Sequence, residues 1–344
     1  MDFPSQELME WFQKNQRPLP WRKAYDPYHV WISEIMAQQT RIDQMQPYYA
    51  RFLKQFPNVH ALADADPQTV LKSWEGLGYY SRARNLHDAA KQVVEKHKGE
   101  LPHSQKELEK LKGFGPYISS AVASIAFNEN VPVVDGNVLR VTTRFWGISE
   151  DVSLPKTREK INAKLNEVLP QGKARAFNQG LMELGALICV PDNPLCSTCP
   201  LQKECFAYRY SKQSSFPVKA KKGKAPQKHF AMAAIRQVDS LGFVQRQTAL
   251  LNGMWECPMV EYSPLTDSTY DIEKKFEEMG IRIKIGTRKG EVKHSYSHFT
   301  QHVHVFEATL TNSTPSTLSW FDSKKLEKKP LSKVQLRVLE LLKK

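Results

Sequence analysis

The spacing of apolar residues divides the chain into two parts with different periodicity. From Gln6 to about Tyr210, apolar positions recur every three or four residues and are separated by short turns that contain Gly or Pro. That period matches one face of an α-helix, so this part is predicted to form a set of amphipathic helices around a common core. We therefore predict an all-helical domain over residues 1–211.

The pattern changes after residue 211. Residues 212–228 carry six lysines and no acidic residue, which predicts an exposed linker that either contacts phosphate groups or serves only as a solvated tether. Alternating apolar and polar residues then predict strands at residues 229–238, 242–247, 281–290 and 302–310. Helical patterns occur at residues 270–279 and 332–344. Residues 229–344 are therefore predicted to form a small α+β domain.

Composition agrees with two folded domains and adds a hint about the partner. A chain of 344 residues with 41% hydrophobic residues is long enough to bury more than one core. Its formal net charge of +13 fits a nucleic-acid partner, and it also fits an ordinary basic protein. Neither a long apolar run nor an export signal is present in the sequence, so a cytoplasmic, nucleoid-associated protein without a membrane span is expected.

Residues 107–127 predict two short helices joined by a Gly-Phe-Gly turn. Gly113 and Gly115 form the turn, and Pro116 opens the second helix, where its missing N–H group leaves no hydrogen bond unmade. The free backbone N–H groups at such a helix start bind a DNA phosphate without reading a base. A purely structural turn is the alternative, but the helices on both sides favour a phosphate-binding helix-hairpin-helix.

A second glycine turn occurs at residues 76–78. It is followed by aromatic and arginine side chains, namely Tyr79, Tyr80, Arg82 and Arg84. Aromatic rings next to guanidinium groups suit a surface that wedges between bases and holds their phosphates. Leu77 and Tyr79 are therefore candidate DNA contacts, whereas Tyr80 is equally well explained as a core residue.

Four of the five cysteines lie within seventeen positions, with the spacing C-x6-C-x2-C-x5-C: Cys189, Cys196, Cys199 and Cys205. Such crowding in a chain without an export signal predicts a bound metal rather than disulfides. Four thiolates can hold one zinc ion or one [4Fe-4S] cluster. Zinc sites usually contain two short cysteine pairs and this one contains a single pair, which favours iron. The remaining cysteine, Cys257, is predicted to be an ordinary buried residue.

These features together resemble a known family. The hairpin at residues 107–127, the sequence VDGNVLRV at 134–141 and the cysteine spacing are similar to the endonuclease III superfamily of DNA glycosylases. Further similarity to the MutY-type adenine DNA glycosylases lies in PWR at 20–22, WISEIMAQQT at 31–40, GLGYYSRARNL at 76–86, and the basic linker with its α+β tail. The resemblance implies a [4Fe-4S] cluster on Cys189, Cys196, Cys199 and Cys205, and a Nudix-like second domain.

The resemblance also implies an activity, the excision of adenine mispaired with 8-oxoguanine or guanine. Adenine leaves poorly, so the reaction needs an acid to protonate the base and an anion to stabilise the cationic sugar. Glu34 lies among apolar residues of a predicted helix, which disfavours its charged form, although a helical Glu is more often a surface residue. The resemblance implies that Glu34 protonates N7 of adenine and then helps to activate water.

Asp135 precedes a predicted helix and is explained as a helix cap, while the resemblance implies that it is the stabilising anion with Asn137 as its orienting partner.

In lyase members of the superfamily a lysine of the hairpin attacks the sugar, and Tyr117 stands at that position here. A phenol cannot form a Schiff base, so a monofunctional glycosylase is expected. Lys112 keeps open the alternative of a bifunctional glycosylase and lyase acting on oxidised bases; a non-catalytic DNA-binding protein is a second alternative.

Contacts with the substrate follow from the same resemblance. It implies three groups of residues: an adenine pocket from Trp21, Arg22 and Gln179; DNA contacts from Gln39, Thr40 and Tyr79; and 8-oxoguanine contacts from Tyr79, Ser297 and His298. The partner implied is double-stranded DNA that contains 8-oxoguanine:adenine or guanine:adenine mispairs, bound by a monomer.

The second domain is expected to read a base rather than to hydrolyse a nucleotide. GMWECP at 253–258 is similar to the start of a Nudix motif, but no cluster of carboxylates follows that could hold magnesium. The histidines at 294, 302 and 304 could suggest zinc, and strand alternation is the favoured explanation.

Overall fold

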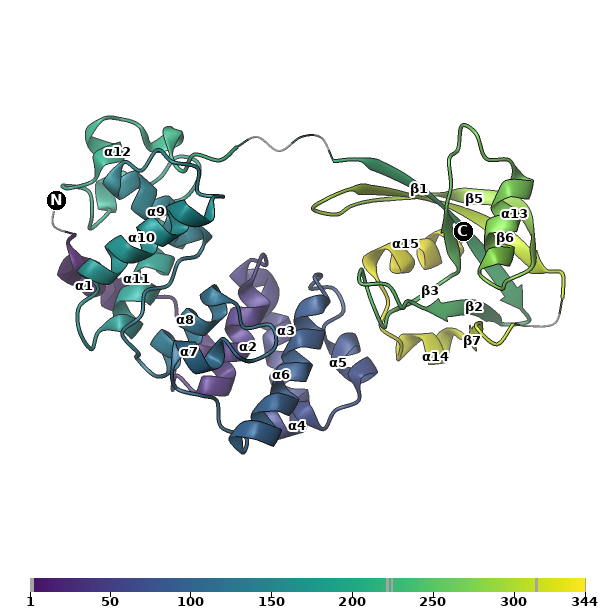
Figure 1. Cartoon of the computed structure of the whole chain (residues 1–344), viewed down its shortest axis with the longest axis horizontal. Helices are drawn as coiled ribbons and strands as arrows, with labels where there is room; N and C mark the ends of the chain where they lie inside the picture. Colours follow the sequence, from purple (N-terminus) through teal and green to yellow (C-terminus); the bar gives the residue numbers. More distant parts are fainter. Residues whose placement is uncertain (1–2, 221–222, 224, 313–314, 344) are drawn as a thin grey trace. The chain divides into compact units, whose positions relative to one another are not determined.

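The computed structural model describes residues 3–220, 223, 225–312 and 315–343, which form two compact units (Figure 1). The first unit comprises the described residues up to Asp64 and from Asp88 to residue 220. The second comprises Ala65–His87 and the described residues from Gly223 onward. Part of the predicted linker, at residues 221, 222 and 224, lies outside the described residues.

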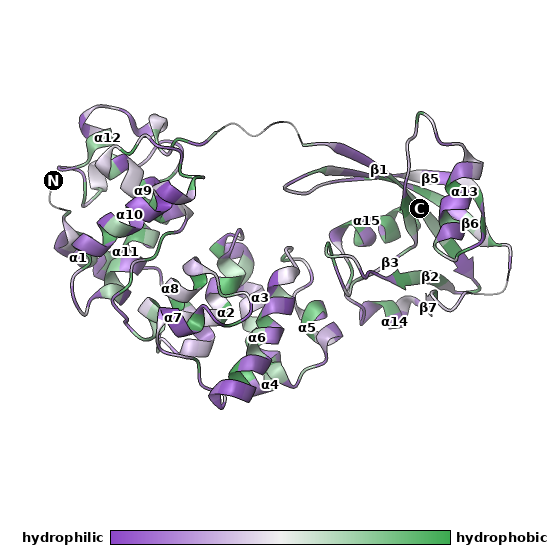
Figure 2. Cartoon of the chain, in the orientation of Figure 1, coloured by the Kyte–Doolittle hydropathy of each residue, from purple (hydrophilic) through white to green (hydrophobic). Residues whose placement is uncertain are grey.

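Among the described residues of the first unit, all regular secondary structure is helical, as the apolar periodicity predicts. Its elements are α1 (Ser5–Asn15), η1 (Pro20–Arg22), α2 (Pro27–Ala37), α3 (Ile42–Gln55), α4 (Val59–Ala63), most of α6 (Ser81–His97), α7 (Gln105–Leu108), α8 (Pro116–Ala126), α9 (Gly136–Trp146), α10 (Pro155–Val168), α11 (Ala174–Leu187), η2 (Cys196–Thr198), α12 (Phe206–Arg209) and η3 (Gln213–Ser215). Hydrophilic residues dominate the visible face of α10, as expected for a helix at the surface (Figure 2).

Two helices in the middle of this unit are buried almost all round. Every residue of α2 from Val30 to Met36 is buried, and so is every residue of α8 from Ile118 to Ala126. The small Ala and Ser side chains of α8 let neighbouring helices approach closely, and α2, α7 and α11 all pack against it. A polar side chain on the buried face of α2 is therefore held in an apolar environment.

The second unit is built on a mixed sheet. Its strands are β1 (Gln227–Gln237), β2 (Ser240–Gln245), β3 (Trp255–Glu256), β4 (Met259–Glu261), β5 (Ile283–Ser295), β6 (Thr300–Leu310) and β7 (Ser319–Phe321). The order is β3-β2-β1-β6-β5, with β4 pairing with β1 and β7 with β2; β1 and β6 run parallel. Helix α13 (Thr269–Glu278) packs on one face of the sheet and α15 (Lys333–Leu341) on the other (Figure 1).

The α+β prediction is confirmed, and the four predicted strands correspond to β1, β2, β5 and β6. The two predicted helices correspond to α13 and α15. The short strands β3, β4 and β7 and the short helix α14 (Ser323–Glu327) were not predicted, because two to five residues carry too little periodicity.

Residues 65–87 group differently from the sequence-based prediction, which assigned them to the helical domain. They contain α5 (Pro67–Ser73) and the second glycine turn, and they pack against C-terminal residues. Gln68 donates to the carbonyl of Gly253 at 2.9 Å, and Arg84 donates to the carbonyl of Asn252 at 3.0 Å. The predicted domain limits at 211 and 228 stay a prediction.

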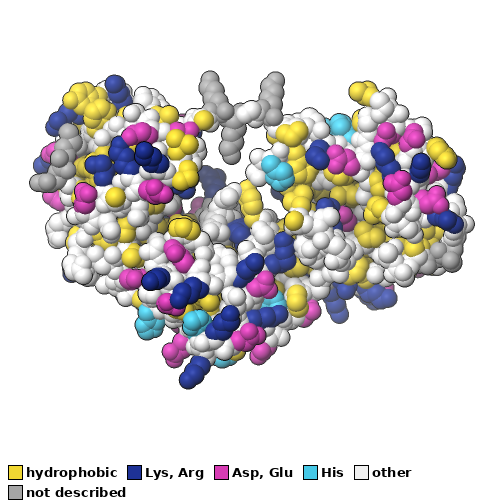
Figure 3. Space-filling model, in the orientation of Figure 1, with side chains coloured by type: hydrophobic (Ala, Val, Ile, Leu, Met, Phe, Trp, Pro, Cys, Tyr) yellow, Lys and Arg dark blue, Asp and Glu magenta, His cyan; other side chains and the backbone are white. Residues whose placement is uncertain are grey.

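Two expectations from composition concern the positive charge and the membrane. Lys and Arg side chains alternate with Asp and Glu over the visible face and do not form one continuous basic field there (Figure 3). Within the described residues, no helix is both long and apolar enough to span a bilayer.

Candidate active site

Glu34 and Tyr117 meet in the interior of the helical unit, from α2 and α8. The Tyr117 hydroxyl donates a hydrogen bond to Oε2 of Glu34 at 2.6 Å, and Glu34 is 6% exposed. Burial raises the pKa of Glu34 to about 7; the Tyr117 hydrogen bond opposes the rise, the charge of Asp135 adds to it, and the charge of Arg22 opposes it. A substantial fraction of this carboxyl group is therefore protonated at neutral pH.

Asp135 occupies the position before α9 and acts as its cap. Its Oδ1 accepts from the backbone N–H of Val138 at 2.7 Å, and its Oδ2 accepts from Nδ2 of Asn137 at 3.1 Å. Burial raises the pKa of Asp135, while the N–H groups of Val138 and Asn137 oppose that rise because they stabilise the ionised form. The predicted cap and the predicted contact with Asn137 are both present.

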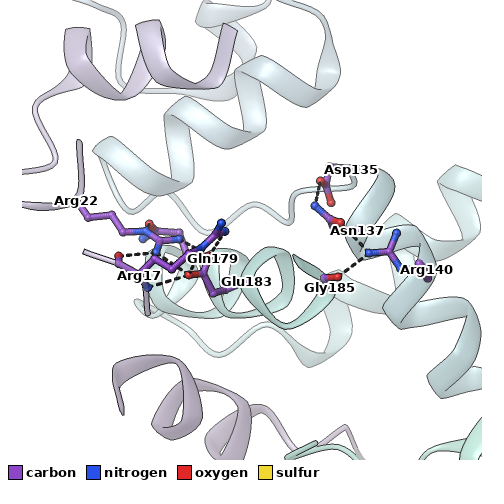
Figure 4. Close-up of polar contacts among 8 residues, drawn as sticks. All are labelled: Arg17, Arg22, Asp135, Asn137, Arg140, Gln179, Glu183 and Gly185. Carbon is purple, nitrogen blue, oxygen red and sulfur yellow. Dashed lines mark hydrogen bonds and ion pairs between the residues drawn. The ribbon is translucent and has the colours of Figure 1, made fainter. Parts of the chain in front are cut away.

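Asn137 is held in turn by Arg140, one turn further along α9 (Figure 4). Arg140 Nη2 donates to Oδ1 of Asn137 at 2.8 Å and to the carbonyl of Gly185 at 2.6 Å, and its Nε donates to the carbonyl of Cys189 at 2.7 Å. A Cβ atom added at position 185 would lie 2.6 Å from Cβ of Asn137, so only glycine leaves room for the Asn137 side chain. A continuous hydrogen-bonded path therefore joins Asp135 to the start of the cysteine loop.

A second polar network includes two of the predicted pocket residues, Arg22 and Gln179 (Figure 4). Arg22 Nε donates to Oε1 of Gln179 at 3.0 Å, and its two terminal nitrogens pair with both oxygens of Glu183 at 3.1 and 2.9 Å. Arg17 reaches the same carboxylate through Nε and Nη2, each at 2.9 Å. Burial acts to raise the pKa of Glu183, but the hydrogen bonds from the two arginines outweigh it and bring the pKa to about 2.

Arg17 and Glu183 were missed in the sequence analysis. The available signal was weak: Glu183 is an acidic residue in the otherwise apolar stretch of residues 180–188, four positions after Gln179. A buried acid on such a face needs a cationic partner, and Arg17 lies only three positions before the PWR motif. Which arginines approach it depends on the packing of α1 and α11, which helical periodicity does not reveal.

The other residues of the helical unit that were predicted to contact the substrate differ in how exposed they are. Trp21 is 6% exposed and packs edge-on against Tyr49, with ring centroids 5.1 Å apart. Gln39 is exposed just after α2 and has a left-handed backbone with φ 56°, and Thr40 follows it half-buried. Their predicted contacts with substrate stay predictions.

The helix-hairpin-helix turn is present at the predicted residues. Gly113 adopts φ 78°, which favours glycine, and Gly115 directly precedes α8, which has no side-chain cap. A side chain added at Gly115 would meet no atom of this chain within 4 Å. The open space at this helix start is what the close approach of a phosphate requires.

The second unit brings together the residues predicted to inspect the opposite base. Tyr79, Ser297 and His298 line one cavity of about 380 Å³. Tyr79 is 47% exposed, whereas Leu77 is 6% exposed. A contact between Leu77 and DNA would require this side chain to leave the core, so its predicted role has less support than that of Tyr79.

The four clustered cysteines line a single small cavity in the helical unit. Arg144, 3% exposed, reaches Sγ of Cys189 at 3.5 Å, and Gln213 Nε2 lies 3.9 Å from Sγ of Cys196. None of the four forms a disulfide, and no set of three metal-binding side chains converges on a single metal ion within the described ranges. Four thiols around one cavity, with N–H donors at two sulfurs, fit a negatively charged metal-sulfur group.

Cys257 and the clustered histidines lie on or beside the strands of the second unit. Cys257 is buried, as predicted, and its sulfur accepts from Nε2 of Gln335 at 3.2 Å. His294 belongs to β5, and His302 and His304 belong to β6. Glu291 accepts from Nδ1 of His302 at 2.6 Å.

Two family models match separate parts of the chain. The model described as an HhH-GPD superfamily base excision DNA repair protein matches residues 32–171, and the model described as a NUDIX domain matches residues 231–341. The first match contains Glu34, the hairpin and Asp135, and the second contains most of the mixed sheet. The predicted order of a helix-hairpin-helix glycosylase domain and a Nudix-like domain is therefore confirmed.

Individual proteins are similar over both parts. The adenine DNA glycosylase of Buchnera aphidicola subsp. Schizaphis graminum (strain Sg) is 31% identical over 98% of this chain and 98% of its own length. The adenine DNA glycosylase of Mus musculus is 31% identical over 90% of this chain and 71% of its own length. Among solved structures, a thermostable thymine-DNA glycosylase is 28% identical with a TM-score of 0.55, covering 60% of this chain and 95% of that one.

Proposed function

This chain belongs to the adenine DNA glycosylases, and from that premise we propose that it flips out and excises adenine paired with 8-oxoguanine or guanine. The family confirms the predicted enzyme class, a base excision repair glycosylase with DNA as its substrate. The choice of mispair, the monomeric state and the roles of individual residues are parts of the proposal.

The observation that carries the proposal is the hydrogen bond between the buried Glu34 and the half-buried Tyr117. Because Tyr117 donates to Oε2 of Glu34, the proton of the neutral acid is left for Oε1. Glu34 acts as the general acid that delivers this proton to N7 of adenine, and the resulting carboxylate then helps to activate water. Departure of a neutral base makes cleavage of the glycosidic bond possible near neutral pH.

Asp135 supplies the negative charge that stabilises the oxocarbenium-like sugar. Its position before α9 supports this role, because a helix start favours an ionised carboxylate. Asn137 orients the carboxylate through its amide, and Arg140 fixes Asn137. Arg22, Gln179 and Trp21 form the pocket for the flipped adenine.

The pH dependence of adenine release follows from the acid role of Glu34. Its pKa of about 7 means that the protonated fraction falls as the pH rises through neutrality. The single-turnover rate of adenine release is therefore expected to decline above about pH 7 and to approach a tenfold loss per pH unit. The measurement is the rate between pH 5.5 and 9 at saturating enzyme. A rate that stays constant up to pH 9 contradicts the acid role.

Tyr117 supports a monofunctional enzyme, because it stands where lyases carry a lysine. Sodium borohydride reduces the Schiff base of a lyase to a stable adduct with DNA, so no more than trace trapping is expected here. Efficient trapping at the rate of adenine release would favour the alternative, a bifunctional glycosylase and lyase with Lys112 as the candidate nucleophile.

The cavity lined by Tyr79, Ser297 and His298 is proposed to inspect the base opposite adenine. Ser297→Ala is expected to lower the preference for 8-oxoguanine:adenine over guanine:adenine about fivefold, because one hydrogen bond to the oxidised base is lost. The comparison is of single-turnover rates on the two duplexes. Ser323→Ala, an exposed residue of α14, is the control. If wild type and Ser297→Ala show the same preference between the two duplexes, Ser297 does not take part in reading the opposite base.

Cys189, Cys196, Cys199 and Cys205 are proposed to hold a [4Fe-4S] cluster, which orders the loop between α11 and η3. Purified protein is expected to contain about four iron atoms per chain. Cys199→Ser should lower that ratio and the visible absorption of the cluster, while Cys257→Ser should leave both unchanged, since Cys257 lies in the core of the other unit. One zinc ion per chain and no iron would contradict the cluster.

A further inference from the structure

We propose that Glu183 is a positioning residue that sets the selectivity for adenine, because it fixes which amide atom of Gln179 is offered to the flipped base. This inference rests on the proposed function, in which Gln179 belongs to the adenine pocket. Glu183 itself is 1% exposed and acts only through Arg22.

The orientation of a glutamine amide decides which base it accepts. Adenine carries an amino group at C6, which donates hydrogen bonds, whereas hypoxanthine and guanine carry an oxygen there, which accepts them. An amide that presents its oxygen therefore favours adenine, and the same amide turned by 180° presents its NH2 group and favours the 6-oxo bases. Selectivity requires that the amide be held in one of the two orientations.

The surroundings of Gln179 permit only one orientation. Arg22 Nε is a pure donor, so the amide atom 3.0 Å from it must be the oxygen. The carbonyl of Arg175 is a pure acceptor, so the atom 3.2 Å from it must be the nitrogen, which also lies 3.3 Å from the Tyr25 hydroxyl. Oε1 keeps a second lone pair, and that lone pair is the acceptor for the amino group of adenine.

Arg22 keeps this arrangement because Glu183 holds its guanidinium group in a fixed plane. The two terminal nitrogens pair with both carboxylate oxygens at 3.1 and 2.9 Å, which leaves Nε as the donor that points to Gln179. Arg17 fixes the carboxylate from another direction with three bonds, one of them from its backbone N–H. Figure 4 shows these four side chains in one connected group, apart from the group around Asp135.

The test compares two bases in one duplex context. Single-turnover rates are measured for adenine and for hypoxanthine, each opposite 8-oxoguanine, with wild type and Glu183→Gln. A glutamine at 183 cannot pair with both guanidinium groups, so Arg22 loses its fixed plane and the amide of Gln179 turns more freely. The ratio of the adenine rate to the hypoxanthine rate is expected to fall at least about tenfold. A merely structural role would slow both bases alike and leave the ratio unchanged.

Three further variants complete the experiment. Arg22→Lys keeps the positive charge and removes the Nε donor, so the same fall in the ratio is expected even if Glu183→Gln does not fold. Glu183→Asp keeps the carboxylate and should retain most of the selectivity, and Glu167→Gln, on the exposed face of α10, should retain all of it. An unchanged ratio in both Glu183→Gln and Arg22→Lys overturns this inference alone. A wild type that releases no adenine overturns the proposed function instead.

Discussion

Replacing Glu34 with glutamine is expected to lower the rate of adenine release by about a thousandfold, while affinity for the mispaired duplex stays close to that of wild type. Glutamine has the same shape and can still accept the hydrogen bond from Tyr117, so the packing of α2 against α8 is kept. Its amide cannot give up a proton at neutral pH, so adenine must leave as an anion. The measurements are the single-turnover rate at saturating enzyme and the Kd from a binding assay on the same duplex.

Two controls make this result specific to the acid. Glu167→Gln makes the same chemical change on the exposed face of α10 and should leave the rate unaltered. Tyr117→Phe removes the hydrogen bond and keeps the acid, so a smaller loss than that of Glu34→Gln is expected. A Glu34→Gln enzyme that retains a tenth or more of the wild-type rate would show that another group protonates the base.

Asp135→Asn is expected to lower the rate of adenine release by about a hundredfold or more with little change in stability. This variant separates the two functions of Asp135. The Asn side chain can still accept from the N–H of Val138 and cap α9, because asparagine caps helices as well as aspartate does. It cannot supply the negative charge that the cationic sugar needs. Single-turnover rate and thermal unfolding temperature are measured together.

Asp135→Ala is the companion variant, because it removes the charge and the cap. A further loss of about 1 kcal/mol in the free energy of unfolding is expected, with a rate no higher than that of Asp135→Asn. If Asp135→Asn excises adenine at the wild-type rate, Asp135 is a helix cap alone.

The secondary structure was largely predictable because periodicity survives in a single sequence. The spacing of apolar residues from Gln6 to Tyr210 reflects helices that mostly bury one face, and alternation after residue 228 reflects the strands of the sheet. The position of residues 65–87 was not predictable in this way. Their grouping depends on contacts such as Gln68 with Gly253, which join residues far apart in the sequence.

The candidate site was likewise predictable only where a local pattern or the resemblance identified a residue. Glu34 and Asp135 could be identified from the resemblance, and the cap at Asp135 also from its place before a helix. The pairing of Glu34 with Tyr117 joins α2 to α8 across 83 positions, and no local pattern encodes it. Glu183 was missed because a helical acid is normally exposed, and only the packing of α1 and α11 reveals that it is buried between two arginines.

Leu77 illustrates a limit of predicting DNA contacts from a local motif. Its place in a glycine turn beside Tyr79 suggested contact with DNA, yet its side chain is 6% exposed, and that of Tyr79 is 47% exposed. Two neighbours in one motif thus differ in accessibility, because the turn directs one side chain into the core and the other to the surface.

The central claim is that this chain cuts the bond between adenine and deoxyribose and leaves the DNA backbone whole. The most direct measurement is a single-turnover reaction on a duplex with one 8-oxoguanine:adenine pair, in which free adenine is quantified and strand length is read before and after alkali. The account predicts one adenine released per duplex and strand breakage only after alkali. Strand breakage without alkali at the rate of base release, or no adenine release, would contradict it.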